Sequence, residues 1–185
     1  MATNNPRYTV LITIHRAHDV PISDIHNLSA DPYVLATIAL PEDLQPSDEP
    51  ALSWRTPTKH CTREPVWEEQ WLIAGVPQEG CTLKLRLTDE DNKDRDDRLG
   101  RAEVCFTPEM MYKGFEIKEQ EFKVKKRRGS FIPYVMTYLA ALLPGECLRK
   151  HSRIIISAKV LDRTENQFDI VRAYTIGPSR FLFMF

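Results

Sequence analysis

The stretch Cys81-Thr82-Leu83-Lys84-Leu85-Arg86-Leu87-Thr88 is the clearest secondary-structure signal in the chain. Its leucines alternate with a lysine and an arginine, so in an extended backbone the apolar side chains fall on one face and the charged ones on the other. This pattern predicts a β-strand that packs one face into a hydrophobic core and turns the opposite face to solvent.

Seven further segments of β type lie before and after this strand, separated by turns rich in proline, glycine and aspartate. They cover residues 8–15, 33–40, 54–59, 67–73, 99–106, 115–124 and 153–161. Eight short strands without alternating helices predict an all-β fold, an eight-stranded antiparallel Greek-key β-sandwich, rather than a doubly wound parallel sheet. Between the last two strands, residues 125–151 contain a basic run and then an apolar stretch that ends at Pro144-Gly145. This segment predicts a short helical insertion.

Composition indicates the size and class of the protein. The chain has 185 residues, of which 42% are hydrophobic and 28% charged, as is typical of one globular domain. We expect this domain to cover residues 1–162, with the insertion at 125–151, and a C-terminal tail or linker to cover residues 163–185. The formal net charge is −1, so any attraction to a polyanionic surface has to come from local patches.

The cysteines and the hydrophobic stretches indicate the compartment. The four cysteines lie far apart and show no CxxC pairing, which favours reduced thiols in the cytoplasm over a disulfide framework or a zinc site. The first residues are polar and lack the apolar core of a signal peptide. No stretch approaches the ~20 apolar residues of a membrane span, and we predict none.

Two of the predicted loops are rich in carboxylates. The loop after the first strand contains Asp24 and Asp31, and a later loop reads Asp89-Glu90-Asp91-Asn92-Lys93-Asp94-Arg95-Asp96-Asp97. Calcium takes about six to eight oxygen ligands, and close carboxylates repel one another when no cation lies between them. A calcium site is therefore one interpretation, and a solvated acidic loop is a second.

Catalysis by paired carboxylates is a third interpretation of these loops. No catalytic nucleophile motif, phosphate-binding glycine loop or metalloprotease motif accompanies the acids. The sequence therefore predicts that this chain is not itself an enzyme.

Three stretches of the sequence, in the same order, resemble the C2 domain family. The first comprises residues 11–20 with Asp24 and Ala30-Asp31-Pro32-Tyr33-Val34. The second comprises residues 62–71, in which Glu64 stands where Asn is usual, and the third is Leu87-Thr88-Asp89-Glu90-Asp91 with Asp97-Arg98-Leu99-Gly100. The early first strand and a spare strand at residues 153–161 resemble the permuted second topology of that family.

The resemblance implies a calcium site made by the two acidic loops. The family's five calcium aspartates correspond to Asp24, Asp31, Asp89, Asp91 and Asp97. Asp94 stands where some members place a further ligand, and the backbone carbonyls of Ile25 and Glu90 complete the implied set. One additional residue separates Asp24 from Asp31, which departs from the family pattern.

The resemblance also implies calcium-dependent binding to anionic, phosphatidylserine-like phospholipid membranes. The protein would then be cytoplasmic and would become a peripheral membrane protein when calcium binds. The candidate lipid-binding residues are Ile25, Leu28, Lys93, Arg95, Lys125, Lys126, Arg127 and Arg128. A thin basic patch of Arg55, Lys59 and Arg63 is interpreted as an ordinary solvated face.

Two other functions stay open at this stage. One is a calcium-independent module that binds a protein partner through the insertion or the tail. The other is the targeting domain of a larger lipid-signalling enzyme. Nucleic acid is not an expected partner, because aromatic residues are not interleaved with the basic run at 125–128.

Overall fold

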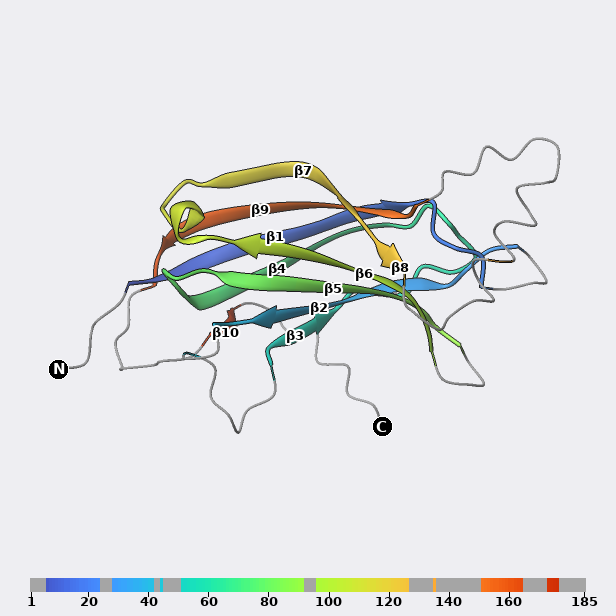
Figure 1. The fold of residues 1–185 in the computed structure, drawn as a ribbon, viewed down its shortest axis with the longest axis horizontal. Coiled ribbons are helices and arrows are strands. Elements are labelled where there is room, and N and C mark those ends of the chain that lie inside the picture. Colours follow the sequence, from blue (N-terminus) through green and yellow to red (C-terminus); the bar gives the residue numbers. More distant parts are fainter. Residues whose placement is uncertain are drawn as a thin grey trace.

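The computed structural model describes residues 6–23, 28–41, 44, 51–91, 96–126, 135, 151–164 and 173–176. Within them, two antiparallel five-stranded sheets pack face to face (Figure 1). The first sheet contains, in spatial order, β10 (Tyr174–Ile176), β4 (Val66–Pro77), β1 (Arg7–His18), β9 (Arg153–Arg163) and β7 (Glu116–Lys123). The second contains β3 (Ser53–Arg55), β2 (Pro32–Ala39), β5 (Cys81–Asp89), β6 (Asp97–Phe106) and β8 (Lys125–Lys126).

The prediction of an all-β antiparallel sandwich is confirmed, but the described part of the chain has ten strands where the sequence predicted eight. The two additional strands, β8 and β10, are two and three residues long, too short to show an alternating pattern. The predicted strand 54–59 is shorter, because β3 ends at Arg55, shortly before Pro57. The predicted helix of the 125–151 insertion lies almost entirely outside the described residues.

The alternation in β5 has the predicted consequence. Leu83, Leu85 and Leu87 are fully buried between the sheets, whereas Lys84 and Arg86 are exposed on the outward surface of the second sheet. The core continues into inward-facing residues of the first sheet, which are Val10, Ile12, Ile14, Trp71, Ile73, Ile154, Ile156, Ala158 and Val160. Burial of each large aliphatic side chain contributes roughly 1.5–3 kcal/mol to folding, so this core holds the two sheets together.

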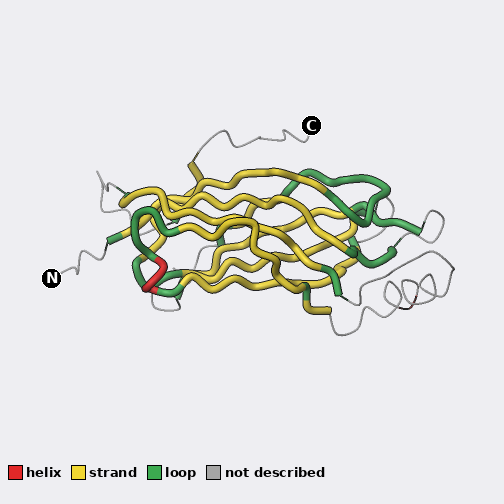
Figure 2. The backbone as a smooth tube through the Cα atoms, turned by 90° about the horizontal axis from the view of Figure 1, so that it is seen from above, coloured by secondary structure: helices red, strands yellow, loops and turns green. Residues whose placement is uncertain are grey.

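The strands run lengthwise between two ends of the sandwich, and loops from both sheets gather at one of them (Figure 2). There Val20 N–H donates to Arg63 C=O and Thr62 N–H donates to Ala30 C=O. The flanks of the insertion reach the same end, because the Ser152 hydroxyl donates to Asp19 C=O at 2.7 Å. No helix among the described residues is long and apolar enough to cross a membrane.

Because neighbouring side chains of β5 alternate between the core and solvent, their substitution should change the free energy of unfolding by very different amounts. Leu85→Ala should lower the free energy of unfolding by about 2–5 kcal/mol, because Leu85 is 1% exposed and its truncation leaves a cavity between the sheets. Urea unfolding followed by tryptophan fluorescence measures the change. The matched control is Lys84→Ala on the solvent side of the same strand, which should stay within about 0.5 kcal/mol of the unsubstituted chain. Equal effects of the two substitutions would contradict this placement of the core.

Candidate functional site

Three loops meet at the loop-rich end of the sandwich: the first loop (residues 19–31), the second loop (56–65) and the third loop (90–96). Backbone hydrogen bonds connect them directly. Ala30 C=O in the first loop accepts the Thr62 N–H of the second, and Asp31 C=O accepts the Glu90 N–H of the third at 3.0 Å. The bases of the three loops are thereby fixed relative to one another.

Asp31 and Asp89 lie in contact at the base of this site. Asp31 N–H donates to Asp89 Oδ1 at 2.5 Å, and the Asp89 side chain is buried, with the residue 1% exposed. The strand register explains this proximity, since Asp89 at the end of β5 is opposite Pro32 on one side and Asp97 on the other. Three of the predicted metal-binding aspartates therefore stand on neighbouring strand ends.

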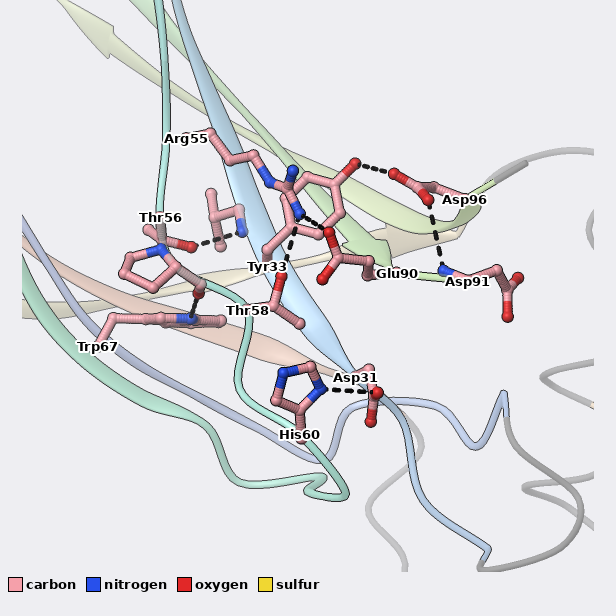
Figure 3. Close-up of polar contacts among 12 residues, drawn as sticks. Asp31, Tyr33, Arg55, Thr56, Thr58, His60, Trp67, Glu90, Asp91 and Asp96 are labelled. Atoms are coloured by element: carbon pink, nitrogen blue, oxygen red, sulfur yellow. Dashed lines mark hydrogen bonds and ion pairs between the residues drawn. The ribbon is translucent and has the colours of Figure 1, made fainter. Parts of the chain in front are cut away.

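His60, in the second loop, contacts the Asp31 carboxylate (Figure 3). Its Nδ1 lies 2.9 Å from Asp31 Oδ2, and Asp31 Oδ1 accepts the Cys61 N–H at 2.7 Å. Burial acts to raise the Asp31 pKa, but the hydrogen bonds from Cys61 N–H and His60 outweigh it, and the pKa is lowered. The hydrogen bond to Asp31 raises the pKa of His60. Sequence reasoning did not identify His60, because only the folded loops bring it to Asp31.

A second polar network surrounds Tyr33 (Figure 3). The Tyr33 hydroxyl donates to Asp96 Oδ2 at 2.7 Å, and Asp96 Oδ1 accepts the Asp91 N–H at 3.4 Å. The Arg55 guanidinium lies 3.8 Å from the centre of the Tyr33 ring and pairs with Glu90. Hydrogen bonding from Thr58 and then from Arg55 lowers the pKa of Glu90. The base of the third loop is therefore tied to both β2 and β3.

The donors in the site suit a hard cation in kind, because the described candidates Asp31, Asp89, Asp91 and Asp97 all offer carboxylate oxygens. Within the described residues, however, no three carboxylate, histidine or cysteine side chains already converge as a metal site. The other predicted ligands from side chains, Asp24 and Asp94, lie outside that part of the chain, as does Ile25. The carbonyl-bearing residue Glu90 is described, and its side chain is paired with Arg55 rather than directed to the aspartates.

The predicted lipid-binding residues divide between described and undescribed parts of the chain. Leu28 is 41% exposed at the edge of the first loop, and Lys125 and Lys126 are exposed in β8. The remaining candidates lie outside the described residues; these are Ile25, Lys93, Arg95, Arg127 and Arg128.

A row of basic side chains that the sequence analysis missed crosses the outward side of the second sheet. The strand register places Arg55, Leu35, Arg86, Arg101 and Lys125 opposite one another in a single row across β3, β2, β5, β6 and β8. We call these residues the cationic row. Its four charged members are exposed, and of them Arg55 pairs with Glu90. Arg86, Arg101 and Lys125 have no ion-pair partner among the residues that the structure describes.

Another network on the first sheet has the connectivity of a nucleophile triad. Ser157 Oγ lies 2.7 Å from His15 Nε2, and His15 Nδ1 lies 2.6 Å from Glu68 Oε2. Ser157 Oγ also accepts the Glu119 N–H at 2.9 Å. His15 stands where the registers of β1 with β4 and of β1 with β9 both shift. These contacts join four strands at irregular positions of the sheet and account for the arrangement as cross-strand support.

Comparison with known proteins matches this architecture to one family. The family model of the C2 domain matches residues 8–121. Synaptotagmin-11 of mouse and of human are each 28% identical to this chain over 104 residues, which is 55% of this chain and 22% of the relative. The chain thus spans about a fifth of the length of these curated relatives.

Solved structures share the fold at low sequence identity. The C2A domain of plant extended synaptotagmin 1 superposes with a TM-score of 0.57 at 15% identity, covering 88% of this chain and all of that one. Human GIVD cytosolic phospholipase A2 superposes with a TM-score of 0.56 at 16% identity, covering 85% of this chain and 17% of that one. The fold is therefore shared with one solved domain over its whole length and with a small part of a larger chain.

The His60–Asp31 contact predicts a defined pH dependence. The raised pKa of His60 means that its contribution to stability is present below its ordinary pKa of 6.5 and is lost as the pH rises through the folded-state value. The lowered pKa of Asp31 means that its contribution is present above 3.8 and is lost as the pH falls through the folded-state value. The ion pair is therefore complete in the window between these limits.

NMR titration of the imidazole resonances in chelator-containing buffer tests this pair. The pKa of His60 should lie above 6.5 in the unsubstituted chain and should fall toward it in Asp31→Asn, because the amide carries no charge. A His60 pKa that is the same in both proteins would show that the contact does not form in solution.

Proposed function

This chain belongs to the C2 domain family, and from that premise we propose that it is a calcium-dependent, peripheral membrane-targeting module. Its proposed ligand is an anionic, phosphatidylserine-like phospholipid surface on the cytoplasmic side of a membrane. The observation that best supports membrane docking is the cationic row. The acidic loops beside it support the dependence on calcium.

The cationic row has a cost that a purely structural surface would avoid. Arg86 and Arg101 are direct cross-strand partners, both are exposed, and like charges in that position destabilise a sheet. A flat anionic surface would remove this repulsion and gain roughly 1 kcal/mol for each basic residue that it meets. The row ends at Lys125, which is the first residue of the basic run Lys125–Arg128 in the sequence.

The proposed calcium ligands are Asp24, Asp31, Asp89, Asp91 and Asp97, with Asp94 and the carbonyls of Ile25 and Glu90 as further donors. Bound calcium would supply positive charge at the loops and open coordination positions for lipid phosphate or carboxylate oxygens. The chain's own contribution is to hold Asp31 and Asp89 together through the Asp31 N–H. Leu28 would add a small apolar contact with the lipid interface.

A second function is favoured by a specific comparison. The structural match to human GIVD cytosolic phospholipase A2 covers 17% of that chain, so a domain of this fold there accompanies a much larger remainder. By analogy, this chain would act as the targeting domain of a larger lipid-signalling enzyme and would not itself be catalytic. This arrangement is compatible with membrane docking, whereas calcium-independent binding of a protein partner is the competing proposal.

Removal of charge from the cationic row should weaken membrane binding. The double variant Arg86→Gln/Arg101→Gln should lose about 2 kcal/mol of affinity, close to 30-fold, for phosphatidylserine-containing vesicles at low ionic strength. Sedimentation with vesicles measures the affinity, and the loss should shrink as salt screens the charges. The matched control Lys123→Gln/Lys159→Gln removes two exposed lysines from the first sheet and should change affinity little. If both variants lost the same affinity for vesicles, binding would depend on net charge alone, and the assignment of membrane binding to the cationic row would be wrong.

Calcium should stabilise the folded chain, because a ligand that binds only the native state raises the free energy of unfolding by about 2.7 kcal/mol at a hundredfold excess over its Kd. The melting temperature should therefore rise in millimolar calcium, and Asp91→Asn should reduce the rise more than substitution of the other aspartates. Asp162→Asn, at the far end of β9, is the control and should leave the rise intact. An unchanged melting temperature together with no heat of binding would exclude the calcium site.

A further inference from the structure

We propose that the outer edge of β10 pairs with the same strand of a second copy of this chain, so that the first sheets of two copies join into one antiparallel sheet. The partner is another molecule of this protein rather than a lipid. The proposal goes beyond membrane docking, because it concerns a surface distinct from the acidic loops and the cationic row, and it does not depend on calcium.

The position of β10 leaves one of its edges open. β10 is the terminal strand of the first sheet (Figure 1), and it pairs with β4, where Tyr174 is opposite Ala74 and Ile176 is opposite Leu72. Its other edge has no strand partner among the residues that the structure describes. Unpaired N–H and C=O groups along such an edge can accept a further strand. β10 also lies beyond residues 8–121, so this edge is formed by a segment outside the family match.

A contact with the core fixes the orientation of β10. Trp71 is 1% exposed, and its Nε1–H donates to Thr175 Oγ1 at 3.1 Å. Thr175 is therefore turned toward Trp71. Because neighbouring residues of a strand point to opposite sides, Tyr174 and Ile176 are turned outward, and each is 38% exposed. The strand thus presents a defined arrangement of side chains to a partner.

The other terminal strands of the two sheets contain charged residues, which disfavour the addition of a strand. Five of the eight residues of β7, at the opposite edge of the first sheet, are charged. In the second sheet β8 consists of two lysines, and β3 contains Arg55. β10 contains no charged residue, and its sequence Tyr-Thr-Ile consists of aromatic and β-branched residues that favour strands. Of the four sheet edges in the described part of the chain, that of β10 therefore fits a partner strand best.

The sequence of β10 is complementary to itself in an antiparallel pair. When Thr175 stands opposite Thr175 of the other copy, Tyr174 of each copy stands opposite Ile176 of the other. Aromatic–β-branched pairs and Thr–Thr pairs both stabilise neighbouring strands. A two-fold axis at the Thr175 pair relates the copies, so the contact closes as a dimer and does not continue into a filament. This self-complementarity favours a second copy over a strand of another protein.

Three residues from each copy make a small contact, so the dimer should be weak. Contacts that bury less than about 1,200 Å² in total are typical of transient complexes, and we expect a Kd on the order of 100 μM. Sedimentation equilibrium of the full chain in chelator-containing buffer should show the average mass rising with concentration from 21.4 kDa toward twice that value. NMR amide resonances of residues 174–176 should shift over the same range, while those of β7 stay constant.

Substitutions at the edge test the pairing. Ile176→Lys should raise the Kd about tenfold, because two symmetry-related pairs change at once. The matched control is Gln120→Lys, which adds the same charge at an exposed position of β7 and should dimerise like the unsubstituted chain. Tyr174→Glu should weaken the dimer as Ile176→Lys does. The double variant Tyr174→Glu/Ile176→Lys should restore it, because the pairing then places opposite charges across the two-fold axis.

Four results would each overturn the proposal. A chain that stays monomeric near 1 mM, roughly ten times the expected Kd, would leave this edge to a strand of another protein. A rise in mass without shifts at residues 174–176 would place the contact elsewhere, and this measurement needs no substitution. An equal loss of association in Gln120→Lys would show that net charge decides, and a double variant as weak as the single variants would exclude the antiparallel register.

Discussion

The pairing of β2 with β5 is the constraint on which the site depends. This one antiparallel register places Pro32 opposite Asp89, Tyr33 opposite Thr88 and Leu35 opposite Arg86. Because side chains alternate with a period of two, a slip of one residue would turn the β5 leucines to solvent and bury Arg86. The burial of Leu83, Leu85 and Leu87 therefore holds more than the core in place. It also holds Asp31 against Asp89 and keeps the arginines on the outward surface.

Negative and positive side chains of this protein gather in two separate regions that lie close together. The net charge of −1 conceals an acidic cluster at the loops and a basic surface on the second sheet. Arg86 and Asp89 are three residues apart in the same strand, which is roughly 10 Å along an extended backbone. The Arg55–Glu90 pair lies between the two regions and belongs to both, since Arg55 is part of the cationic row and Glu90 is part of the third loop.

Strand periodicity was sufficient to predict the sandwich and much of its core, because the alternation in β5 and the β-branched run in β9 are local signals. The sequence also predicted that Asp31 and Asp89 lie at strand ends, because each stands next to a segment with a strand pattern. The contacts of His60 and Tyr33 were not, because they join residues 29 and 63 positions apart and depend on how loops fold together. The cationic row was missed for the same reason: Arg86 and Arg101 are neighbours only through the β5–β6 register. Sequence reasoning instead grouped Arg55 with Lys59 and Arg63, whereas Arg63 Nε donates to Val20 C=O within the first loop's base.

Two features of the fold would act together under the proposed function. Close carboxylates at the loops favour a cation, and directly opposed arginines on the second sheet favour an anionic surface. The positions of the two features are linked by the one strand, β5, that carries both Asp89 and Arg86. A membrane that approaches this end would meet the loops and the outward side of the second sheet together, so the domain would dock inclined rather than upright. Under the proposed function the cationic row would supply long-range attraction. The loops would supply the condition on calcium, because they would attract lipid only when their own negative charge is neutralised.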